Sequence, residues 1–139
     1  MLLRISLFLS ILVSAQSSPL FYQMAYDYVG VCCFTLDGDQ FEKMIADDVL
    51  LWHQTNDGEV LQAKGKEEIT NLFRKYIFSN SSEIDVKKCS FEETDGGIRI
   101  DLLVEENKAN EGRYLFQERT MLHFSGSKIS SIEMHVIKR

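Results

Sequence analysis

Residues 46–73 constrain the fold of this chain more than any other stretch. An acidic pair, a short apolar run, a turn that contains Gly58 and an amphipathic helical pattern follow one another there without a gap. The apolar run over residues 49–54 predicts a strand, and the turn at residues 56–58 predicts a hairpin with a partner strand over residues 59–63. Apolar residues at helical spacing then predict a helix, namely Ile69, Leu72, Phe73, Tyr76 and Ile77. A hairpin followed directly by a helix indicates a domain of mixed α and β structure.

Two further helices are predicted before this stretch. Apolar residues recur at helical spacing from Leu20 to Thr35 and predict a first helix that ends near residues 36–38. A second, short helix follows, with Asp39 as its candidate N-cap and the acidic residues 47–48 at its end. Three apolar side chains of this helix are expected to face the core, those of Phe41, Met44 and Ile45.

The C-terminal part of the chain shows the period-two pattern of strands. Apolar and polar residues alternate over residues 98–104, and glycine-containing turns at residues 95–97, 110–112 and 125–127 delimit four long antiparallel strands. Because both faces of the strand over residues 113–124 carry bulky apolar residues, both faces need cover. The predicted fold is therefore α+β, with a strongly bent, mostly antiparallel sheet wrapped on three N-terminal helices into a cone-shaped barrel.

The first fifteen residues have the pattern of a secretory signal peptide. A positive start at Arg4 precedes an apolar run over residues 5–13 and a small-residue cleavage site at residues 13–15. An uncleaved anchor is the competing interpretation, but the run is shorter than the ~20 residues that a spanning helix needs. We therefore expect a signal peptide over residues 1–15, one domain over residues 16–139, a secreted protein, and no membrane span after cleavage.

Net charge argues against nucleic acid as a partner. The chain has 15 Lys and Arg against 21 Asp and Glu, and removing Arg4 with the signal peptide leaves 14 − 21 = −7. This charge opposes binding to phosphate backbones and to anionic lipid surfaces. The sequence has no Cys or His spacing typical of a zinc site and no phosphate loop, so neither a metal nor a cofactor is expected.

Three cysteines follow the predicted signal peptide. The oxidising route of secretion favours a disulfide between Cys89 and either Cys32 or Cys33. The remaining thiol is expected to be buried as a small apolar group, with a bridge between two subunits as the alternative. Asn80 begins the sequence Asn-Ser-Ser, which is a candidate site for N-glycosylation.

Three segments, in this order, carry a resemblance to a known superfamily. They are residues 46–52, residues 65–73, where a glycine opens a helix, and the closing hairpin at residues 124–129. Together they resemble the nuclear transport factor 2-like, or SnoaL-like, superfamily over nearly the whole predicted domain. The resemblance implies a cone-shaped α+β barrel, a pocket that opens between helices and sheet, and a homodimer formed through the outer sheet face. It does not imply one function, because members include isomerases, dehydratases, epoxide hydrolases, transport adaptors and structural association domains.

Catalytic members of the ketosteroid isomerase type use an Asp base on the first strand, a Tyr on the first helix and an Asp acid on a late strand. The matching positions here hold His53, Val29 with Tyr28 one residue away, and Thr120. His53 shares a strand face with Leu51 and is expected to point into the pocket, where an imidazole with a pKa of ~6.5 can accept a proton. Thr120 donates only a neutral hydrogen bond, and loss of one such donor typically costs ~3–4 kcal/mol of transition-state stabilisation. Isomerase-type proton transfer is therefore disfavoured.

Two main hypotheses for function remain. The favoured one is a secreted, non-enzymatic domain that binds a small hydrophobic ligand in the cone, or a protein partner through its outer sheet. The ligand pocket is expected to be lined by Tyr28, Leu51, His53, Phe73, Leu102 and Phe116. The alternative is a general acid/base enzyme of the isomerase or dehydratase type that acts on a hydrophobic substrate, with His53 as base and Tyr28 as hydrogen-bond donor. A fold that serves only for dimerisation is a third possibility.

Overall fold

A computed structural model describes residues 19–79 and 82–138 of the protein. The predicted signal peptide and Asn80 lie outside the described residues. A first helix over residues 19–30 continues as a π-helical turn, Val31–Thr35. The later helices are α2 (Gly38–Met44) and α3 (Lys66–Phe73), and α3 continues as a second π-helical turn, Arg74–Phe78. The strands are β1 (Ile45–Thr55), β2 (Gly58–Lys64), β3 (Glu83–Thr94), β4 (Gly97–Lys108), β5 (Gly112–Ser125) and β6 (Lys128–Lys138).

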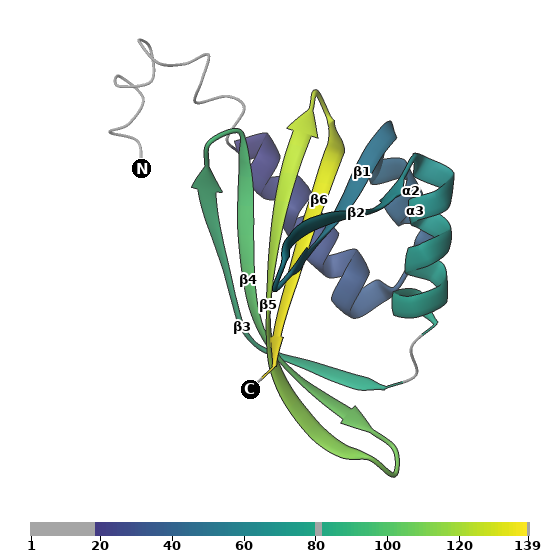
Figure 1. Ribbon diagram of the computed structural model, residues 1–139, viewed down its shortest axis with the longest axis vertical. Helices are drawn as coiled ribbons and strands as arrows, with labels where there is room; N and C mark the ends of the chain where they lie inside the picture. Colours follow the sequence, from purple (N-terminus) through teal and green to yellow (C-terminus); the bar gives the residue numbers. More distant parts are fainter. Residues whose placement is uncertain (1–18, 80–81, 139) are drawn as a thin grey trace.

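The described strands form one curved sheet in the order β2-β1-β6-β5-β4-β3. Only the pairing of β1 with β6 is parallel, and the other neighbours are antiparallel. Strands β2 and β3 are the two edges and do not pair with each other, so the sheet is open rather than a closed barrel. Figure 1 shows the sheet bending around the helices. The predicted cone-like α+β fold is confirmed, and so are the hairpin at residues 56–58 and the four long C-terminal strands.

The helices cover the concave face of the sheet (Figure 1). At one end of the first helix, the ring of Phe21 stacks on Phe124 of β5 with 4.5 Å between ring centroids. Farther along, the ring of Tyr26 lies 4.3 Å from that of Phe91 on the edge strand β3. Helices α2 and α3 cover the part of the concave face near β1. The first helix therefore covers the concave face near β3, and α2 and α3 cover it near β1.

Helix α2 begins and ends earlier than the sequence predicts. Its N-cap is Asp37, whose carboxylate accepts hydrogen bonds from the backbone N–H groups of Asp39 at 3.0 Å and Gln40 at 3.2 Å. Asp39 instead forms an ion pair with Arg74, with 2.7 Å between the charged atoms. The helix ends at Met44 because Ile45 already has extended backbone angles and starts β1. The predictions of Asp39 as N-cap and of a helix end at residues 47–48 are therefore wrong.

Helix α3 follows its predicted apolar pattern for two turns and then departs from it. Ile69 and Phe73 are buried, as expected. Tyr76, which was expected to face the core, is 64% exposed. It lies in the π-helical turn Arg74–Phe78, and the wider π turn changes the direction of the side chains that follow. The apolar stripe that the sequence predicts at α-helical spacing is therefore interrupted after Phe73.

The concave face of the sheet has the predicted alternation. Ile98, Ile100, Leu102 and Val104 on β4 are all at most 6% exposed. Strand β4 begins at Gly97, where a Cβ atom would collide with the backbone carbonyl of Leu122 on β5, so only glycine fits there. None of the helices in the described part of the chain has the length and apolar character that crossing a bilayer requires.

Candidate functional site

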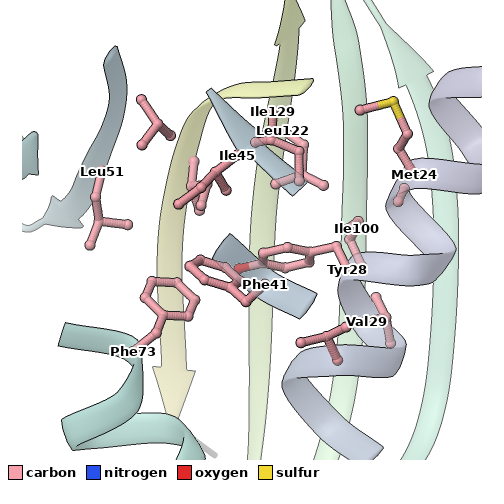
Figure 2. Close-up of a cluster of buried hydrophobic side chains, with 14 of the residues drawn as sticks. Met24, Tyr28, Val29, Phe41, Ile45, Leu51, Phe73, Ile100, Leu122 and Ile129 are labelled. Carbon is pink, nitrogen blue, oxygen red and sulfur yellow. The ribbon is translucent and has the colours of Figure 1, made fainter. Parts of the chain in front are cut away.

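The centre of the cone is packed with side chains of the protein itself. Tyr28, Leu51, Phe73 and Leu102, which the sequence places in a ligand pocket, are between 2% and 6% exposed and belong to the apolar core. Phe41 is fully buried and stacks on Phe73 with 4.3 Å between ring centroids, and its centroid lies 6.4 Å from that of Tyr28. Figure 2 shows Phe41 between these two rings. The structure thus places Phe41 where the predicted pocket residues would face a ligand.

His53 is exposed, so its expected place inside an enclosed pocket is wrong. It pairs with Val60 of β2 and Met134 of β6, and both His53 and Val60 are exposed. Leu51, two residues earlier on the same face of β1, is only 3% exposed and pairs with the buried Ile132. The strand alternation is as predicted, but the packed core ends before His53.

Two polar side chains of β5 lie on the concave face instead. Thr120 is 2% exposed, and Glu118 on the same face is partly buried. The Thr120 hydroxyl lies 3.4 Å from a carboxylate oxygen of Glu118. Thr120 pairs across the sheet with Ile100, and Glu118 pairs with Leu102. The interior position of Thr120 agrees with the sequence, whereas Glu118 was not among the residues that the sequence analysis selected.

The charge of this carboxylate acts on three side chains of the first helix and its π-helical turn. They are the Tyr28 hydroxyl and the thiols of Cys32 and Cys33, and the negative charge of Glu118 raises the pKa of each of them. Burial is the largest cause in all three cases and raises the pKa of Cys33 to about 12. Burial also raises the pKa of Glu118 above its ordinary value of 4.5. We call these five residues, Tyr28, Cys32, Cys33, Glu118 and Thr120, the inner polar cluster.

The predicted disulfide is not formed. Cys32, Cys33 and Cys89 are all free thiols in the structure. Cys32 and Cys33 are partly buried on the π-helical turn, whereas Cys89 is exposed on the edge strand β3. Because burial raises the pKa of each thiol, each is protonated and weakly nucleophilic near neutral pH.

An apolar cleft opens between the end of the first helix and β3, and none of the residues of the inner polar cluster lines it. Its volume is about 360 Å³. We call it the side cleft and define it by the residues that line it, which are Tyr26, Val29, Gly30, Phe34, Val86, Cys89 and Phe91. Tyr26 and Phe34 at its mouth are 55% and 66% exposed. Val29, one of the predicted site positions, lines this cleft, whereas the predicted lining residues Leu51, Phe73 and Leu102 do not.

A larger hollow of about 900 Å³ lies at the N-terminus of α3 and is chemically different. It is lined by Glu42, Asp47, Lys64, Gly65, Lys66, Glu67, Glu68 and Asn71. No aromatic or aliphatic side chain contributes to it, and charges of both signs are mixed, with Lys66 paired to Asp47 at 3.3 Å. These features are typical of a solvated surface, so the smaller apolar cleft is the better candidate for binding. In the described part of the chain, no group of three or more His, Cys, Asp or Glu side chains is placed to hold a metal ion.

Comparison with known proteins supports the fold alone. No protein-family model matches the sequence, and no curated protein is significantly similar to it. The structure is similar to an NTF2-like protein from Anabaena variabilis, with a TM-score of 0.68 and 14% identity over 87% of this chain and 89% of the other. The described protein thus has the nuclear transport factor 2-like fold.

Two further solved structures show the range of proteins that share this fold. An LEH-like epoxide hydrolase from M. tuberculosis has a TM-score of 0.65 and 10% identity, over 85% of this chain and 83% of the other. A protein from Catenulispora acidiphila with a ketosteroid isomerase-like fold, solved in complex with trimethylamine, has a TM-score of 0.60 and 12% identity, over 80% and 82%. An enzyme and a protein that holds a small molecule are therefore both among the structural neighbours.

Proposed function

We propose that the protein binds a small apolar molecule in the side cleft. The observation that carries this proposal is a cleft of about 360 Å³ with aliphatic and aromatic walls. This volume lies within the ~300–1,000 Å³ typical of small-molecule sites, which are mostly apolar with few polar groups. Among the lining residues, Tyr26 and Cys89 carry such polar groups.

The exposed rings at the mouth of the cleft support the same function. Tyr26 and Phe34 expose more than half of their surface although both carry large apolar rings. Leaving such rings in water forgoes the ~1.5–3 kcal/mol that burying an apolar side chain of this size contributes. A ligand in the cleft would cover them. The trimethylamine complex of a structural neighbour is a further reason to expect a small molecule on this fold.

Gly30 offers a direct test. It lines the cleft, has helical backbone angles, and a Cβ atom there would meet no other atom within 4 Å. In Gly30→Leu, the leucine side chain should occupy the cleft without disturbing the fold, because leucine is also a better helix former than glycine. Fluorescence titration with the neutral apolar probe N-phenyl-1-naphthylamine should show binding to the unchanged protein and at least tenfold weaker binding to the variant.

The matched control is Gln40→Leu, which adds the same side chain to an exposed position of α2 outside the cleft. It should bind the probe as the unchanged protein does. Equal probe binding by the Gly30→Leu and Gln40→Leu variants would rule out the side cleft as the site, and absence of probe binding to the unchanged protein would contradict the proposed function.

General acid/base catalysis is the second candidate function, with Glu118 in place of His53 as the base. His53 is exposed, so it is a poor candidate for the base in an enclosed site. Burial raises the pKa of the Glu118 carboxyl, and the charge of this group acts on the Tyr28 hydroxyl, so the two groups are the candidates for proton exchange with a bound substrate. Turnover of an apolar substrate that is lost in Glu118→Gln but retained in His53→Ala would favour this candidate over binding alone.

We extend the proposal to the assembly and location of the protein. The convex face of the sheet carries three exposed aliphatic side chains, Leu61, Leu115 and Ile137, each at least 41% exposed, which a second copy could cover. A homodimer through this face, acting outside the cytosol, is the arrangement we propose. Sedimentation of the purified protein would test the dimer, and fractionation of cells that express the full chain would test secretion.

A further inference from the structure

A row of contacts joins the first helix to the edge strand β3. The Tyr22 hydroxyl accepts a hydrogen bond from the backbone N–H of Glu93, with 3.2 Å between the oxygen and the nitrogen. One helical turn later, the ring centroid of Tyr26 lies 4.3 Å from that of Phe91. Residues four apart lie on the same side of a helix, and residues two apart lie on the same face of a strand. Each step along the row therefore advances the helix by four residues and β3 by two.

Gly30 and Cys89 are the next pair in this row. Four helical residues rise ~6 Å and two strand residues rise ~6.7 Å, so the helix and the strand keep nearly the same spacing. Gly30 has no side chain to fill the space, and a Cβ atom there would meet no other atom within 4 Å. Both residues line the side cleft, and the exposed ring of Phe34, four residues further along, lies at its mouth. The side cleft thus takes the place of one side chain in the row.

The backbone of β3 presents a hydrogen-bond donor at this gap. Alternate residues of a paired strand direct their N–H groups to opposite sides, and the Glu93 N–H points away from β4, toward the Tyr22 hydroxyl. The pairing of β3 with β4 is regular from Lys88 to Thr94, so the Cys89 N–H points the same way as that of Glu93. Because β3 is an edge of the described sheet, no strand of that sheet accepts a hydrogen bond on this side. The Cys89 N–H is therefore available to a molecule in the side cleft.

Aromatic rings and uncharged groups form the walls of the side cleft. Tyr26, Phe34 and Phe91 line it, and none of its described lining residues is Asp, Glu, Lys or Arg. A charged ligand would therefore lose its hydration without gaining a counter-charge. Aromatic rings favour offset-stacked or edge-to-face partners, and this preference adds to the gain from burying apolar surface. The walls favour an uncharged ligand that contains a flat ring.

We propose that the ligand of the side cleft is a neutral, planar aromatic molecule that carries a carbonyl group. Its ring takes the place of the side chain that Gly30 lacks and contacts the rings of Tyr26 and Phe34. Its carbonyl oxygen accepts a hydrogen bond from the backbone N–H of Cys89, as a tyrosine hydroxyl does at the first pair of the row. This inference rests on the proposed function, because it names the class of ligand that the same cleft binds.

Competition against the probe tests the hydrogen bond. The compounds 2-acetylnaphthalene and 2-ethylnaphthalene have nearly the same size and shape, but only the first has a carbonyl oxygen. Each is titrated against N-phenyl-1-naphthylamine bound to the full chain at pH 7, and the ratio of the two dissociation constants is measured. In Cys89→Pro, which removes the N–H group, this ratio should shift against the ketone by at least fivefold. Proline is compatible with this position because the N–H that it removes faces outward from an edge strand.

The matched control is Cys89→Ala, which removes the thiol but keeps the N–H group, and its ratio should equal that of the unchanged protein. A second measurement needs no variant. In the nuclear magnetic resonance spectrum of the unchanged protein, the ketone should move the Cys89 amide proton downfield relative to its position with the hydrocarbon. The Ser90 amide is the internal reference, because its N–H points toward β4 and should respond equally to both compounds.

The preference for a planar ring is tested with 2-acetyldecahydronaphthalene, the saturated counterpart of the ketone. The planar ketone should displace the probe from the unchanged protein at a concentration at least tenfold lower. Phe34→Leu keeps an apolar side chain at the mouth of the cleft but removes the ring, so it should reduce this preference by at least threefold.

The outcomes separate this inference from the proposed function. A ratio that is unchanged in Cys89→Pro, or equal movement of the Cys89 amide proton by both naphthalenes, overturns the hydrogen bond to a carbonyl group. Equal displacement by the planar and the saturated ketone overturns the aromatic class. In each of these cases, probe binding still supports the side cleft as a site for small apolar molecules. Failure of the probe to bind at all overturns the proposed function itself.

Discussion

The two ends of the concave face are built from similar residues but are filled differently. At the β1 end, under α2 and α3, Phe41 is fully buried and stacks on Phe73. At the β3 end, under the first helix, Phe34 is 66% exposed and lines a cleft of about 360 Å³. Phe41 thus completes the core, whereas Phe34 lies at the edge of an unfilled cleft.

Charge pairing differs between the surface and the middle of the sheet. The charged residues near α2 are paired at the surface, as Arg74 is with Asp39. On β5, in the middle of the sheet, Glu118 is partly buried on the concave face and has only a weak hydrogen bond, from Thr120 at 3.4 Å. Packing is complete at the end that stabilises the fold and incomplete at the end where we place the ligand, which is the pattern expected of a binding site.

The largest expected effect distinguishes the two phenylalanines. Phe41→Ala should lower the free energy of unfolding by about 3–5 kcal/mol, because it removes a buried ring and leaves a cavity. Phe34→Ala should change it by less than about 0.5 kcal/mol, because the ring is mostly in water, and should instead weaken binding of the apolar probe. Urea unfolding of both variants, together with probe titration of Phe34→Ala, measures the difference. Similar losses of stability in the two variants would show that the ends do not differ as described.

Local sequence patterns predicted the helices and strands at both ends of the concave face. The glycine turns and the apolar alternation over residues 98–104 depend only on neighbouring residues, so the strands and hairpins could be placed. The burial of each side chain could not be predicted, because it depends on where a helix ends above the sheet. His53 illustrates this limit, since its face of β1 was predicted correctly but the packed core ends at Leu51.

Glu118 was missed for a different reason. The strand over residues 113–124 has apolar residues on both faces, which obscures the alternation. Reading every second residue, however, places Glu118 in one row with Phe116, Thr120 and Leu122, and Leu122 is fully buried. An acidic residue between apolar residues of one strand face is a signal for a buried carboxyl group, and it could have identified this site.

A second, smaller effect on stability distinguishes the carboxylate of the concave face from those of the convex face. Burial raises the pKa of Glu118 above 4.5, so between that pH and the raised pKa the folded protein binds more protons than the unfolded chain. The contribution of Glu118 to stability is therefore fully present below pH 4.5 and is lost as the pH rises through its pKa in the folded protein. Glu118→Gln should thus be more stable than the unchanged protein at pH 7 and no more stable at pH 4.

Urea unfolding of both proteins at pH 4 and pH 7 measures this effect. The control is Glu92→Gln, which removes an exposed ion pair and should change stability by no more than about 1 kcal/mol, without a gain at pH 7. A Glu118→Gln variant that is less stable than the unchanged protein at pH 7 would mean that the folded protein stabilises this charge, and the contrast between the two faces would be wrong.

The smallest expected effect tests whether the bound molecule lies at the β3 end of the concave face. Cys89 lines the side cleft and is exposed, whereas Cys33 is partly buried and its pKa is about 12, so at pH 8 iodoacetamide should alkylate Cys89 first. Saturating N-phenyl-1-naphthylamine should slow alkylation of Cys89 by only a few fold, because a bound molecule covers a side chain that is also reached from the edge of the sheet. Mass spectrometry of the digested protein separates the peptide with Cys89 from that with Cys33, and Cys89→Ser provides the control for the assignment. If the probe leaves the rate at Cys89 unchanged, the bound molecule lies elsewhere in the fold, and the difference between the two ends is one of packing without a role in binding.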